Sequence, residues 1–452
     1  MLGEWYIPGT PTPPEPEQPD WFKESIVAWY SPYCKQKLTN YDVIEAYVED
    51  FTKWAYRDSR GIVKITNNTI VITNVVETNN IVEDDSKPYS DLTIRVTGVT
   101  ENKYLIVRQG RGKPEAHIKK DGVYTFKDNN LYFGFGVSVI GECNITITQL
   151  PTSILKDFSG NGNHAYLYGG KGKLNSGMGV YQQDFSKLII SRVDKKQDPF
   201  GFTVSGSGGT YLAYMQLGNW NNKAFKILAN INAKGDYLYL RFRNSTDAVI
   251  TSVMLKNGEN IIPAQNIEGA TKAVFEYSLK EGETITVTQI PDYPDQLCYD
   301  GKMYAVAYDM PILTDYTVMA ERTWFENRNV FLAKGNITTE AKYAFIFERF
   351  KPDGVMTVQS FGAWNDVVST TDSCISYLTK NKYNGIDIRS GIGADDDMLS
   401  IGGALNKGNI ELTSVCCHGD ILVFNRSLTE YEISWVKNNM MCSKQQEPDI
   451  DL

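Results

Sequence analysis

Long hydrophobic runs are missing from this chain of 452 residues. No apolar stretch approaches the ~20 residues that a membrane-spanning helix needs, so we expect no membrane span. Residues 1–20 have neither a basic start nor an apolar segment, so we expect no secretory signal and a chain made in the cytosol. Basic residues number 45 against 54 acidic ones, a net charge of -9. This balance excludes a protein that binds nucleic acid by neutralising phosphates.

Histidine and paired cysteine motifs are also scarce. The three histidines, His117, His164 and His418, lie far apart in the sequence, so a histidine-rich metal site is not expected. The seven cysteines form no C-x-x-C motif. Because Cys416 and Cys417 are adjacent, their side chains would point to opposite faces of a strand. We therefore expect free, buried thiols of a reducing compartment and no disulfide framework or zinc site.

The composition is that of a folded globular protein, with 42% hydrophobic and 22% charged residues. Short runs rich in Val, Ile, Tyr, Thr and Phe alternate with a period of two and are broken by Gly, Asn and Asp, which is typical of β-strands. Two segments favour a helix, residues 39–47 and 428–440, and in the second Thr429 and Glu432 form a capping box. The predicted class is therefore all-β, a sandwich or jelly roll.

An internal repeat divides the chain. Residues 50–53 (DFTK) return as 184–187 (DFSK), and residues 145–151 (ITITQLP) return as 285–291 (ITVTQIP). Two further segments match in the same order, 104–108 with 237–241 and 120–122 with 256–258. Chance similarity between β-rich segments explains one match but not four in register. The repeat predicts two homologous β-modules, residues 50–150 and 184–291.

The residues outside these modules, 21–49, 151–183 and 292–452, carry a family resemblance. Residues 26–30 (IVAWY) look like the opening strand of a concanavalin A-like, or laminin-G-like, jelly roll, and residues 157–165 (DFSGNGNHA) match a turn of that family. The family's later segments follow in order at 299–301, 313–320, 399–403 and 419–429. The resemblance implies one laminin-G-like β-sandwich, interrupted by the two modules and closed by a short C-terminal helix. Loop ends that lie close together allow such insertions at little entropic cost.

Catalysis is not expected, so we expect a protein that is not an enzyme. Glycosidases of this fold carry two carboxylates on one strand, as E-x-D-x-E or E-x-D-x-x-E, and the sequence lacks that string. Glu430 and Glu432 are two residues apart, but they belong to the start of the predicted closing helix. A G-x-S-x-G motif, a P-loop and a G-x-G-x-x-G motif are absent too.

Two segments are candidate ion sites. Asp395, Asp396 and Asp397 cluster in one predicted loop, and the resemblance implies calcium near a sheet edge there. The alternative, which we favour, is a solvated acidic turn. In the turn from residue 157 to 164, an ion is again possible. We favour a structural role there, with Asp157 and Ser159 binding backbone amides while Gly160 and Gly162 adopt positive φ.

Two tryptophans in polar turns are candidate carbohydrate-binding residues, since sugar rings stack on exposed aromatic rings and bind nearby amides. They are Trp220 with Asn221, and Trp364 with Asn365. The alternative for each tryptophan is a place in the core, because tryptophan is highly buried on average.

Residues 1–20 contain six prolines and predict an extended N-terminal arm. Segments 26–32, 38–54 and 150–169 resemble structural proteins of crAss-like bacteriophages of gut Bacteroides. This resemblance implies a head or tail fibre or decoration on the virion, assembled in the host cytoplasm, that contacts host or mucosal glycans. It also implies that the arm binds other virion proteins, with Trp5, Tyr6, Pro8 and Pro11 as anchoring residues, and that the protein is a homo-oligomer, commonly a trimer in such fibres. The alternatives are a secreted bacterial carbohydrate-binding protein and a glycan-cleaving enzyme.

Overall fold

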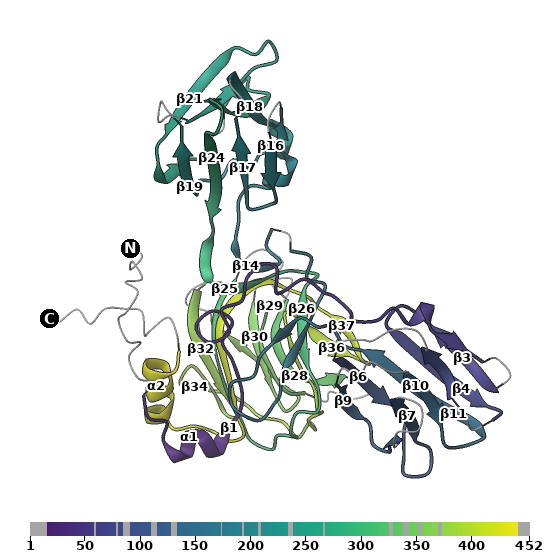
Figure 1. Ribbon diagram of the computed structural model, residues 1–452. Coiled ribbons are helices and arrows are strands. Elements are labelled where there is room, and N and C mark those ends of the chain that lie inside the picture. The colour runs from purple at the N-terminus through teal and green to yellow at the C-terminus, as the bar shows by residue number, and fades with distance from the viewer. Residues whose placement is uncertain are drawn as a thin grey trace.

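The computed structural model of the chain describes residues 16–57, 60–77, 80–84, 91–109, 115–127, 133–172, 174–191, 194–206, 209–233, 238–264, 267–324, 329–337, 343–350, 355–368 and 373–441. Within these residues strands dominate, and they form three bodies of two sheets each (Figure 1). A search of the same residues finds no helix with the length and apolarity of a membrane span. The predicted anchoring residues Trp5, Tyr6, Pro8 and Pro11 lie outside the described part of the chain.

The central body is a sandwich of two large sheets. The first has eight strands: β14 (Gly177–Val180), β25 (Asp292–Asp300), β38 (Val415–Phe424), β27 (Thr317–Trp324), β32 (Ser373–Thr379), β33 (Lys382–Tyr383) and β34 (Ile386–Asp387), with β1 (Ile26–Tyr30) beside β38. The pairing of β1 with β38 is antiparallel and sets Trp29 opposite Leu422. The first and last strands of the chain therefore lie side by side in one sheet.

The second sheet of the central body has ten strands. They are β12 (Ile154–Leu155), β13 (Ala165–Tyr168), β26 (Tyr304–Ala307), β35 (Leu399–Ile401), β28 (Val330–Ile337), β29 (Tyr343–Phe350), β30 (Met356–Ser360), β31 (Ala363–Val367), β36 (Ala404–Asn406) and β37 (Asn409–Glu411). Buried side chains of both sheets, such as Tyr299, Val318, Phe345 and Ile401, form one hydrophobic core between them.

The two inserted modules share one topology. Module 1 pairs β2 (Ala55–Tyr56), β5 (Asn80–Asp84), β10 (Phe133–Val137), β7 (Leu105–Gln109) and β8 (Ala116–Ile118) in one sheet, and β3 (Gly61–Ile65), β4 (Thr69–Val75), β11 (Gly141–Gln149), β6 (Leu92–Thr97) and β9 (Gly122–Phe126) in the other. Module 2 repeats both orders with β15 (Ile189–Ile190), β18 (Gly209–Gln216), β23 (Lys272–Leu279), β20 (Leu238–Arg243) and β21 (Val249–Leu255), and with β16 (Asp194–Gln197), β17 (Gly201–Ser205), β24 (Thr284–Ile290), β19 (Phe225–Asn232) and β22 (Gly258–Ile262). The predicted fold class, an all-β sandwich interrupted by two homologous β-sandwich modules, is confirmed.

Equivalent glutamines close the two modules at their necks, where the chain enters and leaves. In module 1, Gln149 accepts a hydrogen bond from the backbone N–H of Glu49 (2.9 Å) and donates one to its carbonyl (2.8 Å). In module 2, Gln289 makes the same pair of bonds with the backbone of Gln183, at 2.9 and 2.6 Å. Both glutamines are buried, so each bond pair satisfies a backbone N–H and carbonyl that water does not reach. The repeated T-Q-L/I-P segment thus joins the exit of each module to its entry, and we call this pair of hydrogen bonds the glutamine clasp.

The cysteines differ from the sequence prediction in part. Cys298 on β25 and Cys417 on β38 are direct cross-strand partners, with Cα atoms 4.0 Å apart, and form a disulfide. Cys34 is disulfide-bonded as well. The prediction of free thiols is therefore wrong for these three cysteines. For Cys298 and Cys417 it failed because it ignored strand pairing between residues far apart in the sequence. Cys143 and Cys416 are free and buried, as expected.

The helices are α1 (Asp20–Ser25) and α2 (Glu430–Asn439), with short 3-10 turns at Phe51–Lys53, Phe185–Lys187 and Leu217–Asn219. The predicted closing helix is confirmed as α2. The predicted helix at 39–47 is wrong, since that segment forms turns. Asp42 accepts hydrogen bonds from the backbone and side chain of Thr39, and the backbone N–H of Glu45 binds the carbonyl of Gly170 (2.9 Å). Bonds to a neighbouring segment replace those of a helix here.

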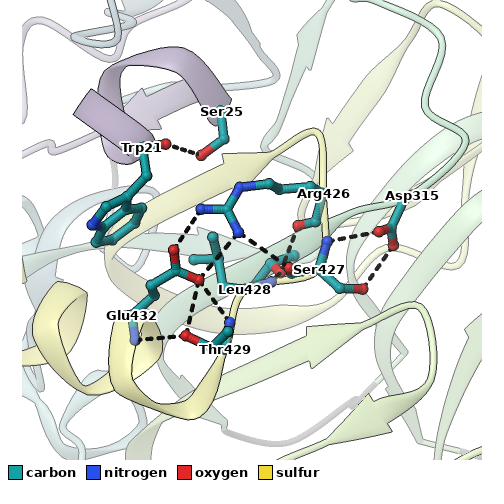
Figure 2. A network of polar contacts seen from close by, with 9 residues as sticks. Trp21, Ser25, Asp315, Arg426, Ser427, Leu428, Thr429 and Glu432 are labelled. Carbon is teal, nitrogen blue, oxygen red and sulfur yellow. Dashed lines mark hydrogen bonds and ion pairs between the residues drawn. The ribbon is translucent and has the colours of Figure 1, made fainter. Parts of the chain in front are cut away.

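The start of α2 is fixed by the network in Figure 2. The Thr429 hydroxyl accepts from the backbone of Glu432, and the Glu432 carboxylate accepts from the backbone of Thr429 (2.8 Å), which completes the capping box. The same carboxylate binds the Arg426 guanidinium at 2.6 and 3.1 Å. These bonds, first to Arg426 and then to Thr429, lower the pKa of Glu432 from 4.5 to about 2.

The lowered pKa gives the Glu432→Gln variant a pH signature. Because the ionised carboxylate is bound only in the folded state, its contribution to stability is full above pH 4.5 and is lost as the pH falls toward about 2. We expect Glu432→Gln to lower the free energy of unfolding by about 1–2 kcal/mol at neutral pH. In urea titrations this difference should shrink with falling pH over that range, while the exposed control Glu24→Gln shows none. A deficit that is independent of pH would contradict the assignment.

Candidate functional site

Trp220 is not a surface platform. Its side chain is 6% exposed and lies in the core of module 2, edge-on to Phe225 and Phe242 with ring centroids 5.5 and 5.6 Å away. The prediction that Trp220 stacks on a sugar is therefore wrong: the flanking asparagines reach the surface, while the indole fills the core. Asn221 does lie at the surface, where its side chain donates to Gln182 (3.2 Å).

Trp364 and Asn365 lie on β31, the edge strand of the ten-stranded sheet. Trp364 is 37% exposed, and the guanidinium of Arg349 lies 5.3 Å from its ring centroid. Asn365 is buried, and its amide bonds the backbone of Arg389 in both directions, at 2.9 Å each. Asn365 therefore holds a loop in place, which removes it from the predicted carbohydrate site. Trp364 therefore keeps a half-exposed ring, but it lacks the neighbouring amide that the sequence prediction paired with it.

The acidic run at residues 395–397 binds protein donors. Asp395 accepts from Lys334 (2.9 Å) and from the backbone of Leu313 (2.7 Å), and both charged side chains are fully buried. Burial lowers the pKa of Lys334 and raises that of Asp395, and the contact between them opposes both shifts. Asp396 and Asp397 bind one another through side chain and backbone (2.7 Å). A buried lysine thus occupies the candidate calcium position, and the favoured alternative, a solvated acidic turn, is wrong for Asp395 because its side chain is buried. Among the described residues, no group of three His, Cys, Asp or Glu side chains is arranged to hold a metal ion.

The turn at residues 157–164 is structural. Asp157 accepts from the backbone N–H groups of Trp29, Ser159 and Asn163, each at 2.9 Å. Gly160 and Gly162 have φ values of 90° and 77°, as expected for this turn. Its carboxylate therefore fastens β1 to the turn, and the structural interpretation of the motif is confirmed.

A cleft of about 440 Å³ lies where module 2 meets the central body. Three segments form it: the turn at residues 39–41, Met178 of β14 with Tyr181 just after that strand, and the outer face of the sheet that contains β16, β17 and β24. Figure 1 shows module 2 standing apart from the body and joined to it beside β14 and β25. The cleft is thus next to the neck of module 2, within the size range of small-ligand sites.

Aromatic rings form one wall of this cleft. The Tyr181 ring packs on Phe200 with centroids 4.7 Å apart, and Tyr41 lies edge-on to Phe200 at 6.5 Å. Phe200 is buried, whereas Tyr41 is 62% exposed and forms the lip of the cleft. An exposed ring backed by two others offers a rigid apolar surface to a ligand.

Polar side chains fix these rings. The Tyr41 hydroxyl donates to Asp198 (2.8 Å), and Asn40 donates to the Tyr181 hydroxyl (3.1 Å). The bond to Asp198 is the main cause that raises the pKa of Tyr41, so the phenol stays protonated and keeps donating. The other oxygen of Asp198 accepts from the backbone of Phe200 and Gly201, at 2.8 and 2.9 Å. Asp198 is therefore a positioning residue for the exposed ring.

Tyr181 also lines a second recess, of about 530 Å³. Its lining includes three amides, Asn175, Gln182 and Asn221, and the half-exposed ring of Tyr293. The sequence prediction named Asn221, which lines this recess, as a carbohydrate-binding candidate, but it missed the aromatic residues of both recesses. Tyr41, Tyr181 and Phe200 lie in separate parts of the sequence, and only the insertion of module 2 brings them together. The one available signal was a polar turn with a tyrosine at 39–41, which the predicted helix concealed.

Comparisons with solved structures give remote similarities. No protein-family model and no curated protein matches the chain. The N-terminal CBM22-1–CBM22-2 tandem domain from Paenibacillus barcinonensis Xyn10C is 10% identical, with 55% of this chain and 96% of that one covered and a TM-score of 0.17. Trypanosoma rangeli sialidase, in complex with the inhibitor DANA, is 10% identical, with 83% of each chain covered and a TM-score of 0.23. At these scores neither similarity carries an argument about this protein.

The pair of Lys334 and Asp395 makes a prediction about calcium. Asp395→Ala leaves a lysine ammonium buried and unpaired, so we expect it to cost about 3–5 kcal/mol of unfolding free energy in urea titrations. The double variant Lys334→Met/Asp395→Leu should recover most of that loss, and the exposed control Asp387→Ala should change little. Adding calcium or EGTA should leave the wild-type midpoint unchanged. A calcium-dependent midpoint that disappears in Asp395→Ala would restore the metal site.

Proposed function

We propose that the protein binds glycans without cleaving them, and that the cleft beside the neck of module 2 holds the sugar. The observation that carries this proposal is the Tyr41 ring, exposed at the lip of the cleft and held there by Asp198. Sugar rings have apolar faces and hydroxyl-bearing edges, so they bind where an aromatic face adjoins fixed polar groups. Asn40 and the threonines of the cleft floor supply those groups.

The acidic residues of the cleft support binding over cleavage. Among the described residues that line it, Asp198 is the only carboxylate, and its two oxygens are occupied by Tyr41 and by the backbone. Hydrolysis of a glycosidic bond generally uses two carboxyl groups on opposite sides of that bond. The cleft offers no such pair.

We further propose that the protein belongs to the surface of a bacteriophage particle. The support is the resemblance of segments 26–32, 38–54 and 150–169 to structural proteins of crAss-like phages. The packing of the two helices is consistent with it: α1 and α2 contact through Phe22 and Trp435, whose ring centroids are 5.9 Å apart. Both ends of the described chain therefore leave the body at the same place, and module 2 stands elsewhere (Figure 1). A protein anchored by its arm would project module 2 away from the particle.

A second candidate is a secreted bacterial carbohydrate-binding protein. The disulfide between Cys298 and Cys417 favours it, because disulfides persist mainly in oxidising compartments. Imaging of purified phage particles with an antibody against the protein distinguishes the two candidates. Labelled particles support the virion protein, and protein found only in the bacterial culture medium supports the secreted one.

Glycan binding is tested by removing the exposed ring. We expect Tyr41→Ala to weaken binding to the best ligands of a mucin and bacterial polysaccharide array by about tenfold or more. Tyr41→Phe should lose less, since it keeps the ring and removes only the bond to Asp198. Tyr431→Ala, which removes a tyrosine 75% exposed on α2, is the matched control and should bind as wild type does. Equal binding by Tyr41→Ala and wild type would reject this cleft as the site.

A further inference from the structure

We infer that the glycan held in this cleft is acidic, and that a carboxylate of the sugar chain binds Lys196. The inference rests on the proposed glycan-binding function and names the chemical class of its ligand. It comes from the cleft floor, where the sheet of module 2 presents a lysine and three threonines.

The residues of the floor form rows across three neighbouring strands. Lys196 on β16 is the direct partner of Thr203 on β17, which is the direct partner of Thr286 on β24. Direct partners project from the same face of a sheet. The hydroxyls of the two threonines are 3.0 Å apart, which confirms that they share that face. Lys196 therefore stands at the end of a row of hydroxyl groups.

The next row contains a glycine and remains open. Gly201 is the direct partner of Thr288. A Cβ atom at residue 201 would lie 2.7 Å from the carbonyl oxygen of Val287, so a larger residue does not fit without a shift of the backbone. With no side chain at this place, the exposed hydroxyl of Thr288 is reached from the cleft.

Among the described residues that line this floor, Lys196 supplies the one cationic group, an ammonium that only donates hydrogen bonds. Among the described residues, no acidic side chain pairs with the Lys196 ammonium, which is exposed. One of the two hydroxyl protons of Thr203 and Thr286 is used in the hydrogen bond between them, and the other is free for a ligand. The Thr288 hydroxyl is also available. Asp198, two residues from Lys196, already accepts three hydrogen bonds from Tyr41, Phe200 and Gly201.

A carboxylate complements this set better than a neutral sugar does. It offers only acceptors, and it forms charge-assisted hydrogen bonds with an ammonium. The negative charge of Asp198, which also lines the cleft, is bound by the donors of Tyr41, Phe200 and Gly201. A sugar ring on Tyr41 with an acidic group on Lys196 would therefore use both walls of the cleft. Uronic and sialic acids are sugars of this kind.

The test compares acidic probes with their neutral derivatives. Oligogalacturonate, oligomannuronate and sialylated mucin O-glycans are measured against the same molecules with their carboxyl groups methyl-esterified. We expect at least one acidic probe to bind about tenfold more tightly than its ester, with an affinity that falls as NaCl rises. Lys196→Gln should remove both the preference and the salt dependence, and Lys196→Arg should retain much of each. Lys256→Gln, an exposed lysine of module 2 outside the cleft, controls for net charge.

The outcomes separate this inference from the function on which it rests. If wild type binds neutral glycans or sulfated ones and ignores the carboxylates, or if Lys196→Gln keeps the preference for them, the inference is wrong, while a loss of binding in Tyr41→Ala still supports the cleft. If wild type binds no acidic or neutral probe, the proposed function fails and the inference fails with it.

Discussion

The pairing of β1 with β38 holds the central sandwich together, because these strands come from opposite ends of the chain. Two modules intervene between them, so the sandwich is complete only when both have folded and the chain has returned. The turn at residues 157–164 strengthens this closure, since Asp157, Asn161 and Asn163 bind the backbone of β1 after the first module has ended. Long-range pairing of this kind costs loop entropy, and compact modules with closed necks reduce that cost. The fold therefore depends on each module bringing its two ends together.

The glutamine clasps explain how one β-unit serves twice. Gln149 and Gln289 bind the backbone at the entry of each module, so the exit strand is fixed to the segment that enters the module. The copies nevertheless contact the body differently. Module 1 is docked through the backbone of Val123, which donates to Asp309 (2.6 Å), and through Arg95 over the ring of Tyr308. In module 2, the outer face of the corresponding sheet at β16, β17 and β24 is exposed instead and forms the floor of the cleft.

The sequence was a good guide to the fold and a poor one to the site. Period-two runs, the four matched segments and the capping box at Thr429 predicted the strands, the repeated module and α2, because each is a local signal. The helix at 39–47 was wrong because Asp42 binds Thr39 within the segment and the backbone of Glu45 binds Gly170, which is distant in the sequence. Trp220, in the N-W-N-N turn, was wrongly predicted to be exposed, because polar neighbours in the sequence do not show whether an aromatic ring is buried in the core. Tyr41, Tyr181 and Phe200 meet through tertiary structure alone, as do Cys298 and Cys417, so no local pattern identifies either set.

The disulfide has a mechanical consequence. β24, the exit strand of module 2, runs through Pro291 directly into β25, and Cys298 joins β25 to the central strand β38. A force on a ligand bound beside module 2 would be transmitted along β24 and β25 into the middle of the eight-stranded sheet, beyond the hydrogen bonds of Gln289. The covalent link keeps β25 from being peeled away under load, so tension would reach the sandwich as shear between paired strands.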